Sequence, residues 1–260
     1  MLDRVPPADP PHPESPGDPA TIEVAGLILK AGGAPLSRPL RLSLPVGQWT
    51  AVLGPSGVGK STLLKALAGL GPDGDLTDGR TGGLAGRVAY MAQSDGLLPW
   101  LSVADNGALG ARLRGQPVDR VRLATLLQAV GLKAQAGLRP DALSGGMRQR
   151  AALVRTLMED RPVVLMDEPF SALDPVTRLD LQDLAARTLA GRTVLMVTHD
   201  PMEALRLAHR ILILHGRPAR LDTPIIPPGV PPRSPTAGDL PARHAALLER
   251  LHHLAAEGGR

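Results

Sequence analysis

One stretch of the sequence decides the fold of this chain: Gly54-Pro55-Ser56-Gly57-Val58-Gly59-Lys60-Ser61-Thr62. It fits the pattern of a phosphate-binding loop, in which a glycine and four further residues precede Gly-Lys-Ser or Gly-Lys-Thr. The apolar segment 49–53 before it predicts a strand, and the segment 63–68 after it predicts a helix. Because the motif needs this strand-loop-helix context, we favour a phosphate site over a chance spacing of glycine and lysine.

The residue types of the loop suit a polyphosphate. Glycines remove the Cβ atoms that would keep backbone N–H groups away from phosphate oxygens, and the N-terminus of the helix adds further donors. Lys60 is placed to reach the β- and γ-phosphates, Ser61 to ligate a magnesium ion and Thr62 to contact the α-phosphate. On its own, the loop predicts only a site for nucleotide phosphates.

Composition limits the class of protein. With 260 residues, 43% of them hydrophobic, the chain is long enough for one large domain or two smaller ones. A formal charge of +4 and 2% aromatic residues predict no nucleic-acid partner. The lack of cysteine excludes disulfides and thiolate chemistry and fits a reducing compartment. No apolar run approaches the roughly 18 residues that cross a bilayer, so any membrane role is expected to be peripheral.

The order of apolar segments predicts an α/β fold with a parallel sheet. Residues 1–20 are rich in proline and predict a disordered leader, whereas 21–29 and 40–44 predict an antiparallel pair of strands. The glycine-rich segment 69–86 predicts irregular structure, and 102–138 predicts a mostly helical insertion. Further strands are expected at 49–53, 87–91, 163–166, 193–198 and 211–214, and further helices at 63–68, 144–159, 176–189, 201–207 and 240–256.

Two acidic residues, Asp167 and Glu168, follow the buried strand predicted at 163–166. Asp167 is expected to hold magnesium, directly or through water. Glu168 is expected close to the γ-phosphate, where a carboxylate orients the attacking water or accepts its proton. The alternative is a solvated pair of acids at a strand end. We favour the functional interpretation because the chain already carries a phosphate loop.

The sequence LSGGMRQR at 143–150 has no place in a simple phosphate-loop kinase or GTPase. A serine and two glycines that open a helix offer a hydroxyl, free N–H groups and a positive dipole end to a phosphate oxygen. Taken alone, the segment is a capped helix start. Beside the loop, it predicts a second phosphate site in a chain that has one loop.

Taken together, these motifs resemble those of the ATP-binding-cassette family. LSGGMRQR is similar to the family's signature motif, and the other motifs occur in the family's order. The glutamine loop matches at Gln93, the Walker B pair at Asp167 and Glu168, the D-loop at SALD ending in Asp174, and the switch histidine at His199. Several motifs in order are far more specific than a lone glycine-rich loop.

The resemblance covers about residues 21–221 and implies an α/β P-loop NTPase (RecA-like) core. An N-terminal antiparallel β subdomain and a helical subdomain at about 94–155 would complete this domain. Residues 1–20 would be a leader, and 222–260 a proline-rich tail with a terminal helix. The resemblance also implies ATP and Mg2+ as cofactors and a head-to-tail homodimer. Each ATP would lie between the phosphate loop of one subunit and residues 144–146 of the other.

The family's roles carry over to individual positions. Gln93 would sense the metal and the lytic water, Glu168 would be the catalytic base, and His199 would contact the γ-phosphate. The phosphates would be bound by Gly54, Pro55, Ser56, Gly57, Val58, Gly59, Lys60, Ser61 and Thr62, the metal by Ser61, Gln93 and Asp167, and ATP across the interface by Ser144, Gly145, Gly146 and Asp174.

One departure from the family concerns the base. The family usually stacks adenine on an aromatic residue in its first hairpin, but the matching position here is near Ala31. Trp49, at the start of the loop strand, is expected to be part of the core. Base selectivity is therefore predicted to be looser than is usual in the family.

The segments 97–106 and 167–175 resemble importer subunits for nitrate, sulfonate, taurine and hydroxymethylpyrimidine. The YMAQ sequence and the short glycine-rich region favour the hydroxymethylpyrimidine group. The resemblance implies a separate integral membrane permease and, indirectly, a periplasmic solute-binding protein as partners. It places the chain peripherally on the cytoplasmic face of the inner membrane.

Two alternatives stay open at this point. Leu97, Leu98 and Trp100 are expected either to line a groove for the coupling helix of the permease or to fill the core of the helical subdomain. A soluble cassette ATPase that is not tied to transport, or a subunit for another solute or for export, would share the ATP site. A phosphate-loop kinase is disfavoured because it would not need LSGGMRQR or His199.

Overall fold

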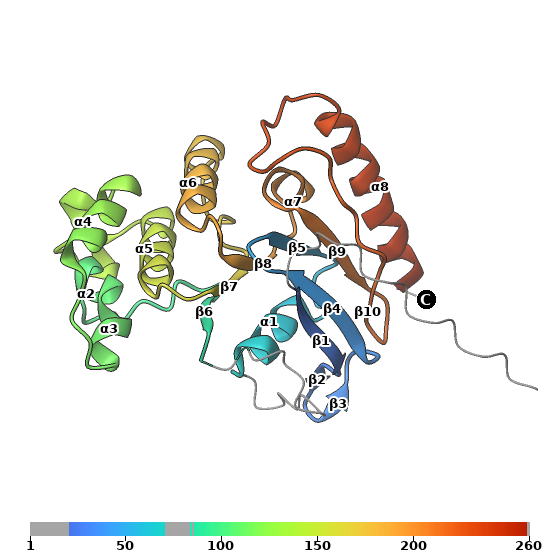
Figure 1. The fold of residues 1–260 in the computed structure, drawn as a ribbon, viewed down its shortest axis with the longest axis horizontal. Coiled ribbons are helices and arrows are strands. Elements are labelled where there is room, and N and C mark those ends of the chain that lie inside the picture. Colours follow the sequence, from blue (N-terminus) through green and yellow to red (C-terminus); the bar gives the residue numbers. More distant parts are fainter. Residues whose placement is uncertain (1–20, 71–83, 85, 259–260) are drawn as a thin grey trace, which may run out of the picture.

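The computed structural model describes residues 21–70, 84 and 86–258, and a six-stranded sheet runs through its centre (Figure 1). The strand order is β10-β9-β5-β8-β7-β6. All neighbours run parallel except β10, which pairs antiparallel with β9 at one edge, so the predicted α/β fold with a parallel sheet is confirmed. The strands are β5 (Trp49–Leu53), β6 (Val88–Met91), β7 (Val163–Asp167), β8 (Thr193–Val197), β9 (Arg210–His215) and β10 (Arg220–Leu221).

One face of the sheet is covered by an antiparallel layer and one helix. β1 (Thr21–Leu27) pairs with β4 (Leu40–Pro45), as predicted, and β2 (Lys30–Ala31) with β3 (Ala34–Pro35) forms a hairpin between them. α1 (Lys60–Ala68) follows the phosphate loop. Its leucines join those of β1 and β4 in one hydrophobic cluster with alternate residues of the sheet.

The opposite face is covered by four helices, which share a second hydrophobic cluster with the other set of alternate sheet residues (Figure 1). These helices are α5 (Gly145–Met158), α6 (Pro175–Thr188), α7 (Pro201–Leu207) and α8 (Leu240–Gly258). β5, β7 and β8 are buried along their whole length because both faces of the sheet are covered, which explains their continuous apolar runs.

The predicted helical insertion is present beside the sheet and packs on α5. It consists of α2 (Val103–Gly107), α3 (Leu109–Leu113), α4 (Arg120–Ala129) and the 3-10 turns Lys133–Gln135 and Pro140–Ala142. The domain limits inferred from the sequence, including 94–155 for this subdomain, stay predictions. The predicted leader at 1–20 and most of the glycine-rich segment 69–86 lie outside the described residues.

Two apolar residues of the insertion are exposed although their spacing in the sequence is typical of a buried helix face. Leu113 is 78% exposed and Val121 is 79% exposed, although both fit the helical spacing of their neighbours. The chain divides at Ala108 into two five-residue helices, so the helical period does not continue across the break. In α4, the first turn faces outward and the buried side chains are Leu123, Leu126 and Leu127.

The proline-rich tail packs on the core through a buried arginine. Arg233 is 8% exposed and donates hydrogen bonds to five backbone carbonyls, those of Leu205, Ala208, Pro227, Pro228 and Gly229. Proline carbonyls keep their acceptor capacity although proline lacks an N–H group. The tail leads to α8, at the place where the sequence predicts a terminal helix.

Candidate functional site

The phosphate loop begins at the carboxyl end of β5, which lies between β8 and β9 in the sheet. Gly54 has no room for a side chain, because an added Cβ atom would lie 2.1 Å from the carbonyl oxygen of Leu214. Gly59 precedes α1 with a φ of 107°, which favours glycine. No side chain caps α1 there, so its first N–H groups stay available for an anion.

Lys60 lies inside the loop that it closes. Its Nζ atom donates hydrogen bonds to the carbonyl oxygens of Gly54 at 2.7 Å and Pro55 at 3.0 Å. Burial lowers the pKa of the Lys60 ammonium, while the carboxylates of Glu168 and Asp167 act in the opposite direction. The loop backbone thus holds the cation next to two acids.

Asp167 ends β7 and is 2% exposed. Burial raises the pKa of its carboxyl group, and a hydrogen bond from Ser61 acts against this rise. One of its oxygens, Oδ1, is buried and has no hydrogen-bond partner among the described residues. Hard divalent cations prefer oxygen ligands, so this unpaired carboxylate oxygen and the Ser61 hydroxyl fit the predicted magnesium ion.

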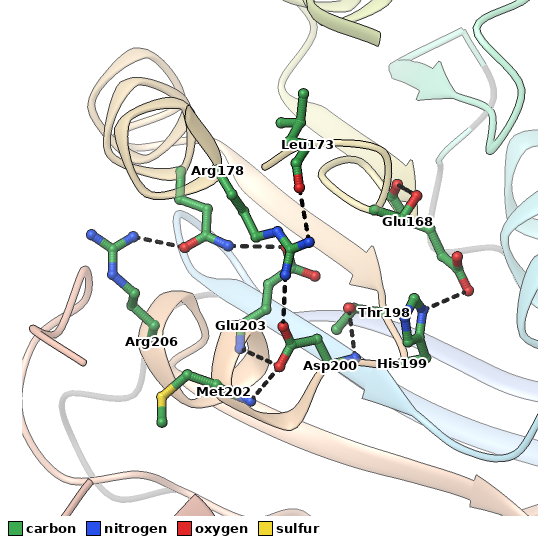
Figure 2. A network of polar contacts seen from close by, with 11 residues as sticks. Glu168, Leu173, Arg178, Thr198, His199, Asp200, Met202, Glu203 and Arg206 are labelled. Carbon is green, nitrogen blue, oxygen red and sulfur yellow. Dashed lines mark hydrogen bonds and ion pairs between the residues drawn. The ribbon is translucent and has the colours of Figure 1, made fainter. Parts of the chain in front are cut away.

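Two other predicted catalytic residues contact the carboxylate of Glu168. The Nε2 atom of Gln93 donates to its Oε2 at 3.3 Å. Nδ1 of His199 lies 3.2 Å from its Oε1 (Figure 2). These three residues follow β6, β7 and β8, which are neighbours in the sheet, so their side chains meet at one edge. The structure therefore brings the three predicted catalytic residues together beside the phosphate loop.

The predicted second phosphate site opens α5. Ser144 is the N-cap residue of this helix, and its Oγ accepts a hydrogen bond from Met147 N at 3.3 Å. Ser144 and Gly145 are exposed and Gly146 is partly so. α5 and α1 pack on opposite faces of the sheet, so the two helices that start at phosphate-binding motifs lie apart in one chain.

Asp174 is the N-cap residue of α6 and accepts a hydrogen bond from Thr177 N at 3.0 Å, which lowers the pKa of its carboxyl group. Arg178 joins the turn before Asp174 to the residue that follows His199 (Figure 2). The guanidinium of Arg178 donates to the carbonyl of Leu173 at 3.0 Å and to Asp200, next to His199, at 3.4 Å. The D-loop and the switch histidine are thereby connected within the chain.

A buried acid of α7, the helix that follows His199, connects this helix to α6. Glu203 is 4% exposed, and burial raises the pKa of its carboxyl group to about 7. It accepts a hydrogen bond from Gln182 at 3.0 Å, and Gln182 in turn accepts one from Arg206 at 2.9 Å (Figure 2). These hydrogen bonds hold α6 against α7, the helix that follows His199.

Sequence reasoning missed the polar residues that support the site. Arg178, Gln182 and Glu203 follow the D-loop and the switch histidine without belonging to a motif. Gln149 is part of LSGGMRQR, yet no role was assigned to it, although it is 7% exposed and contacts the Glu168 turn. The sequence did contain a signal for Gln149, because it is a polar residue at a position where the helical period predicts burial.

The β2–β3 hairpin presents no aromatic side chain. Its Ala31 is exposed, and Trp49 is 5% exposed in the main hydrophobic cluster, as predicted. We therefore expect kcat/KM for GTP to lie within about tenfold of the value for ATP. Base stacking on an aromatic ring contributes about 1–3 kcal/mol, so Ala31→Tyr should lower KM for both nucleotides. Steady-state hydrolysis of ATP and GTP by both proteins measures this, and strict preference of the wild type for ATP would contradict it.

Known proteins share this arrangement. The family model described as ABC transporter matches residues 37–171. An uncharacterized ABC transporter ATP-binding protein of Haemophilus influenzae is 40% identical over 235 residues, which cover 88% of this chain and 98% of the relative. An aliphatic sulfonates import ATP-binding protein of Escherichia coli (strain K12) is 44% identical over 218 residues, covering 82% of this chain and 83% of the relative.

A solved structure extends the likeness to three dimensions. It is a dimeric ATP-binding cassette in a post-hydrolysis state bound to ADP and phosphate. It matches with a TM-score of 0.69 and 26% identity over 81% of this chain and all of that chain. With the phosphate loop, the signature segment and the Glu168 cluster on a matching fold, the chain belongs to the ABC transporter family as an ATP-hydrolysing member.

Proposed function

We propose that this chain is the ATP-hydrolysing subunit of a bacterial importer, which works as a homodimer on the cytoplasmic face of the inner membrane. It would energise a separate permease that receives solute from a periplasmic binding protein. The observation that carries the hydrolytic part is the meeting of Gln93 and His199 on the Glu168 carboxylate, beside the phosphate loop.

The site residues divide the chemistry among them. Residues 54–62 hold the phosphates through backbone N–H groups and the Lys60 ammonium. Ser61 and Asp167 hold Mg2+, which neutralises charge on the phosphate oxygens when it is bound. Glu168 orients a water molecule toward the γ-phosphate and accepts its proton, and His199 places a ring nitrogen near the same phosphate.

The proposed dimer completes the site. The Ser144 segment opens a helix of fourteen residues with exposed N–H groups, and in its own chain it lies on the other side of the sheet from α1. A head-to-tail dimer brings this segment onto ATP that is held by the partner's loop. The likeness to a dimeric cassette bound to ADP and phosphate supports this arrangement.

The permease surface is proposed to lie on the helical insertion. A cavity of about 590 Å³ is lined there by residues of α2, α3, α4 and the segment between α3 and α4, among them Ala104 and Leu123. Leu97 is 8% exposed and belongs to the core, whereas Trp100 is 64% exposed. Burial places Leu97 in the core, and the exposure of Trp100 supports our proposal that this residue contacts the permease. Among the helices of residues 21–70, 84 and 86–258, none combines the length and hydropathy that a bilayer crossing demands.

Aliphatic sulfonates are the solute class that we propose within the nitrate, sulfonate, taurine and hydroxymethylpyrimidine group. The names of several relatives at 41–44% identity, which are aliphatic sulfonates import proteins, support sulfonates over the hydroxymethylpyrimidine type favoured by the YMAQ sequence. Growth on an alkanesulfonate as sulfur source, with and without the chain, tests the class.

Tagged protein purified from detergent-solubilised membranes tests the importer role. We expect an integral membrane protein to co-purify with the wild type. Trp100→Ala should reduce its recovery by about tenfold, because exposed tryptophans often dominate interface energies. Val230→Ala, which changes an 83% exposed residue of the tail, should not. ATP hydrolysis by the isolated Trp100→Ala protein should stay at the wild-type rate. Recovery of the wild type without any membrane protein would favour a soluble cassette ATPase.

A further inference from the structure

The backbone of Glu168 is held by a residue of the signature helix. Gln149 lies in the second turn of α5, where its Nε2 atom donates to the carbonyl oxygen of Glu168 at 3.1 Å. Its Oε1 atom accepts a hydrogen bond from Ala172 N at 3.0 Å. One amide side chain, which is 7% exposed, therefore spans the turn between the catalytic carboxylate and the D-loop.

This turn needs such support because Glu168 has an unusual backbone. Its φ is 49°, in the left-handed region that bulky residues rarely adopt. Its N–H donates to the carbonyl of Val197 at 2.8 Å. Its carbonyl accepts bonds from Ser171 N at 3.3 Å and Ser171 Oγ at 3.1 Å in addition to the one from Gln149. The direction of the Glu168 side chain thus depends on a small set of backbone contacts.

The first turn of α5 also lies against the D-loop. A Cβ atom added at Gly146 would lie 3.5 Å from Leu173 Cδ2 and 3.6 Å from the carbonyl oxygen of Ala172. The close approach at Gly146 and the hydrogen bonds of Gln149 therefore place two turns of the helix against one loop. These contacts form a continuous connection between the exposed Ser144 end of α5 and the Glu168 backbone.

We propose that Gln149 is a positioning residue that couples the two ATP sites of the dimer. It transmits engagement of the signature segment with the partner's ATP to the catalytic carboxylate of its own subunit. The proposal rests on the proposed function, because it needs an ATP-dependent dimer with shared sites. It predicts that each site is fully active only when the signature segment of the same chain is engaged, so hydrolysis depends cooperatively on ATP concentration.

Gln149→Met tests the proposal because methionine matches glutamine in length and makes neither hydrogen bond. We expect kcat to fall by about 10- to 100-fold, since small misplacements of catalytic groups have effects of this size. KM should stay within about twofold, and the Hill coefficient should fall to about 1. Gln149→Glu keeps an oxygen that accepts from Ala172 N. Its second oxygen takes the place of the amide nitrogen and cannot donate to the Glu168 carbonyl. This variant should lose at least as much activity.

Thr156→Val is the matched control. Thr156 is another buried polar residue of α5, and within the part of the chain that the structure describes its hydroxyl bonds only to Ala152 O of the same helix, at 3.0 Å. It should keep the wild-type kcat and Hill coefficient. In the Glu168→Gln background, Gln149→Met should still dimerise with ATP, which separates mispositioning of Glu168 from damage to the signature segment.

Wild-type kcat and Hill coefficient in both Gln149 variants would overturn the proposal. A loss that Thr156→Val shares, or one that follows a lower melting temperature and lost dimerisation, would also overturn it, because α5 would then act only through stability. Failure of the proposed function looks different: Glu168→Gln alone would then retain turnover or bind ATP without forming a dimer.

Discussion

Replacing Glu168 by glutamine is expected to lower the rate of ATP hydrolysis by about 100-fold or more, while ATP binding persists. Glutamine keeps the size of the side chain and one acceptor oxygen, so one of the two contacts, to Gln93 or to His199, can persist, but it cannot accept the proton of the attacking water. Because hydrolysis is what reopens the proposed dimer, the ATP-bound dimer should accumulate.

Phosphate release under saturating ATP measures the first effect, and size-exclusion chromatography with ATP measures the second. Glu249→Gln makes the same chemical change on an exposed residue of α8 and should leave both unchanged. Turnover of the Glu168→Gln protein at the wild-type rate would show that another group takes the proton, and the assignment of the base would be wrong.

Ser144→Arg is expected to reduce hydrolysis by about 100-fold, with ATP binding to the single chain nearly unchanged. The residue is exposed at the start of α5, apart from the phosphate loop of its own chain, so the substitution should not touch the ATP that this chain holds. It should instead block the approach to the partner's ATP with a bulky side chain.

Ser102→Arg is a matched control for the lost helix cap. Ser102 is the N-cap of α2 and accepts a hydrogen bond from Asp105 N, as Ser144 does from Met147 N. Either change should destabilise the fold by about 1 kcal/mol. Only Ser144→Arg should lose turnover, measured with equilibrium ATP binding and melting temperature. Equal losses in both variants would mean that capping, and not contact across a dimer, explains the effect.

The sheet could be predicted from the sequence because its strands are buried on both faces. β7 and β8 are runs of five buried residues, and such runs between helical segments have few other interpretations. The phosphate loop and the N-cap of α5 were predictable for a related reason. Each depends on neighbours in sequence, so local residue types are sufficient to indicate the structure.

The supporting contacts of the site could not be predicted. Gln149 reaches Ala172, and Arg178 reaches Asp200, across 23 and 22 positions respectively. Pairings of this kind follow from how α5, α6 and the strand ends are placed in space, and they leave no periodic pattern in the sequence. The tail shows the same limit. Its many prolines favour irregular structure. Arg233 is nevertheless buried there and donates hydrogen bonds to the carbonyl oxygens of Pro227 and Pro228.

The central claim is that one ATP site is built from two copies of this chain. Light scattering with ATP, combined with counting of bound nucleotide, tests it directly on Glu168→Gln and on Glu168→Gln with Ser144→Arg. We predict that the first protein has the mass of a dimer with two ATP molecules, and that the second keeps the mass of one chain with one ATP. Dimerisation of the second protein like the first, or a fully loaded first protein that stays a single chain, would contradict the account.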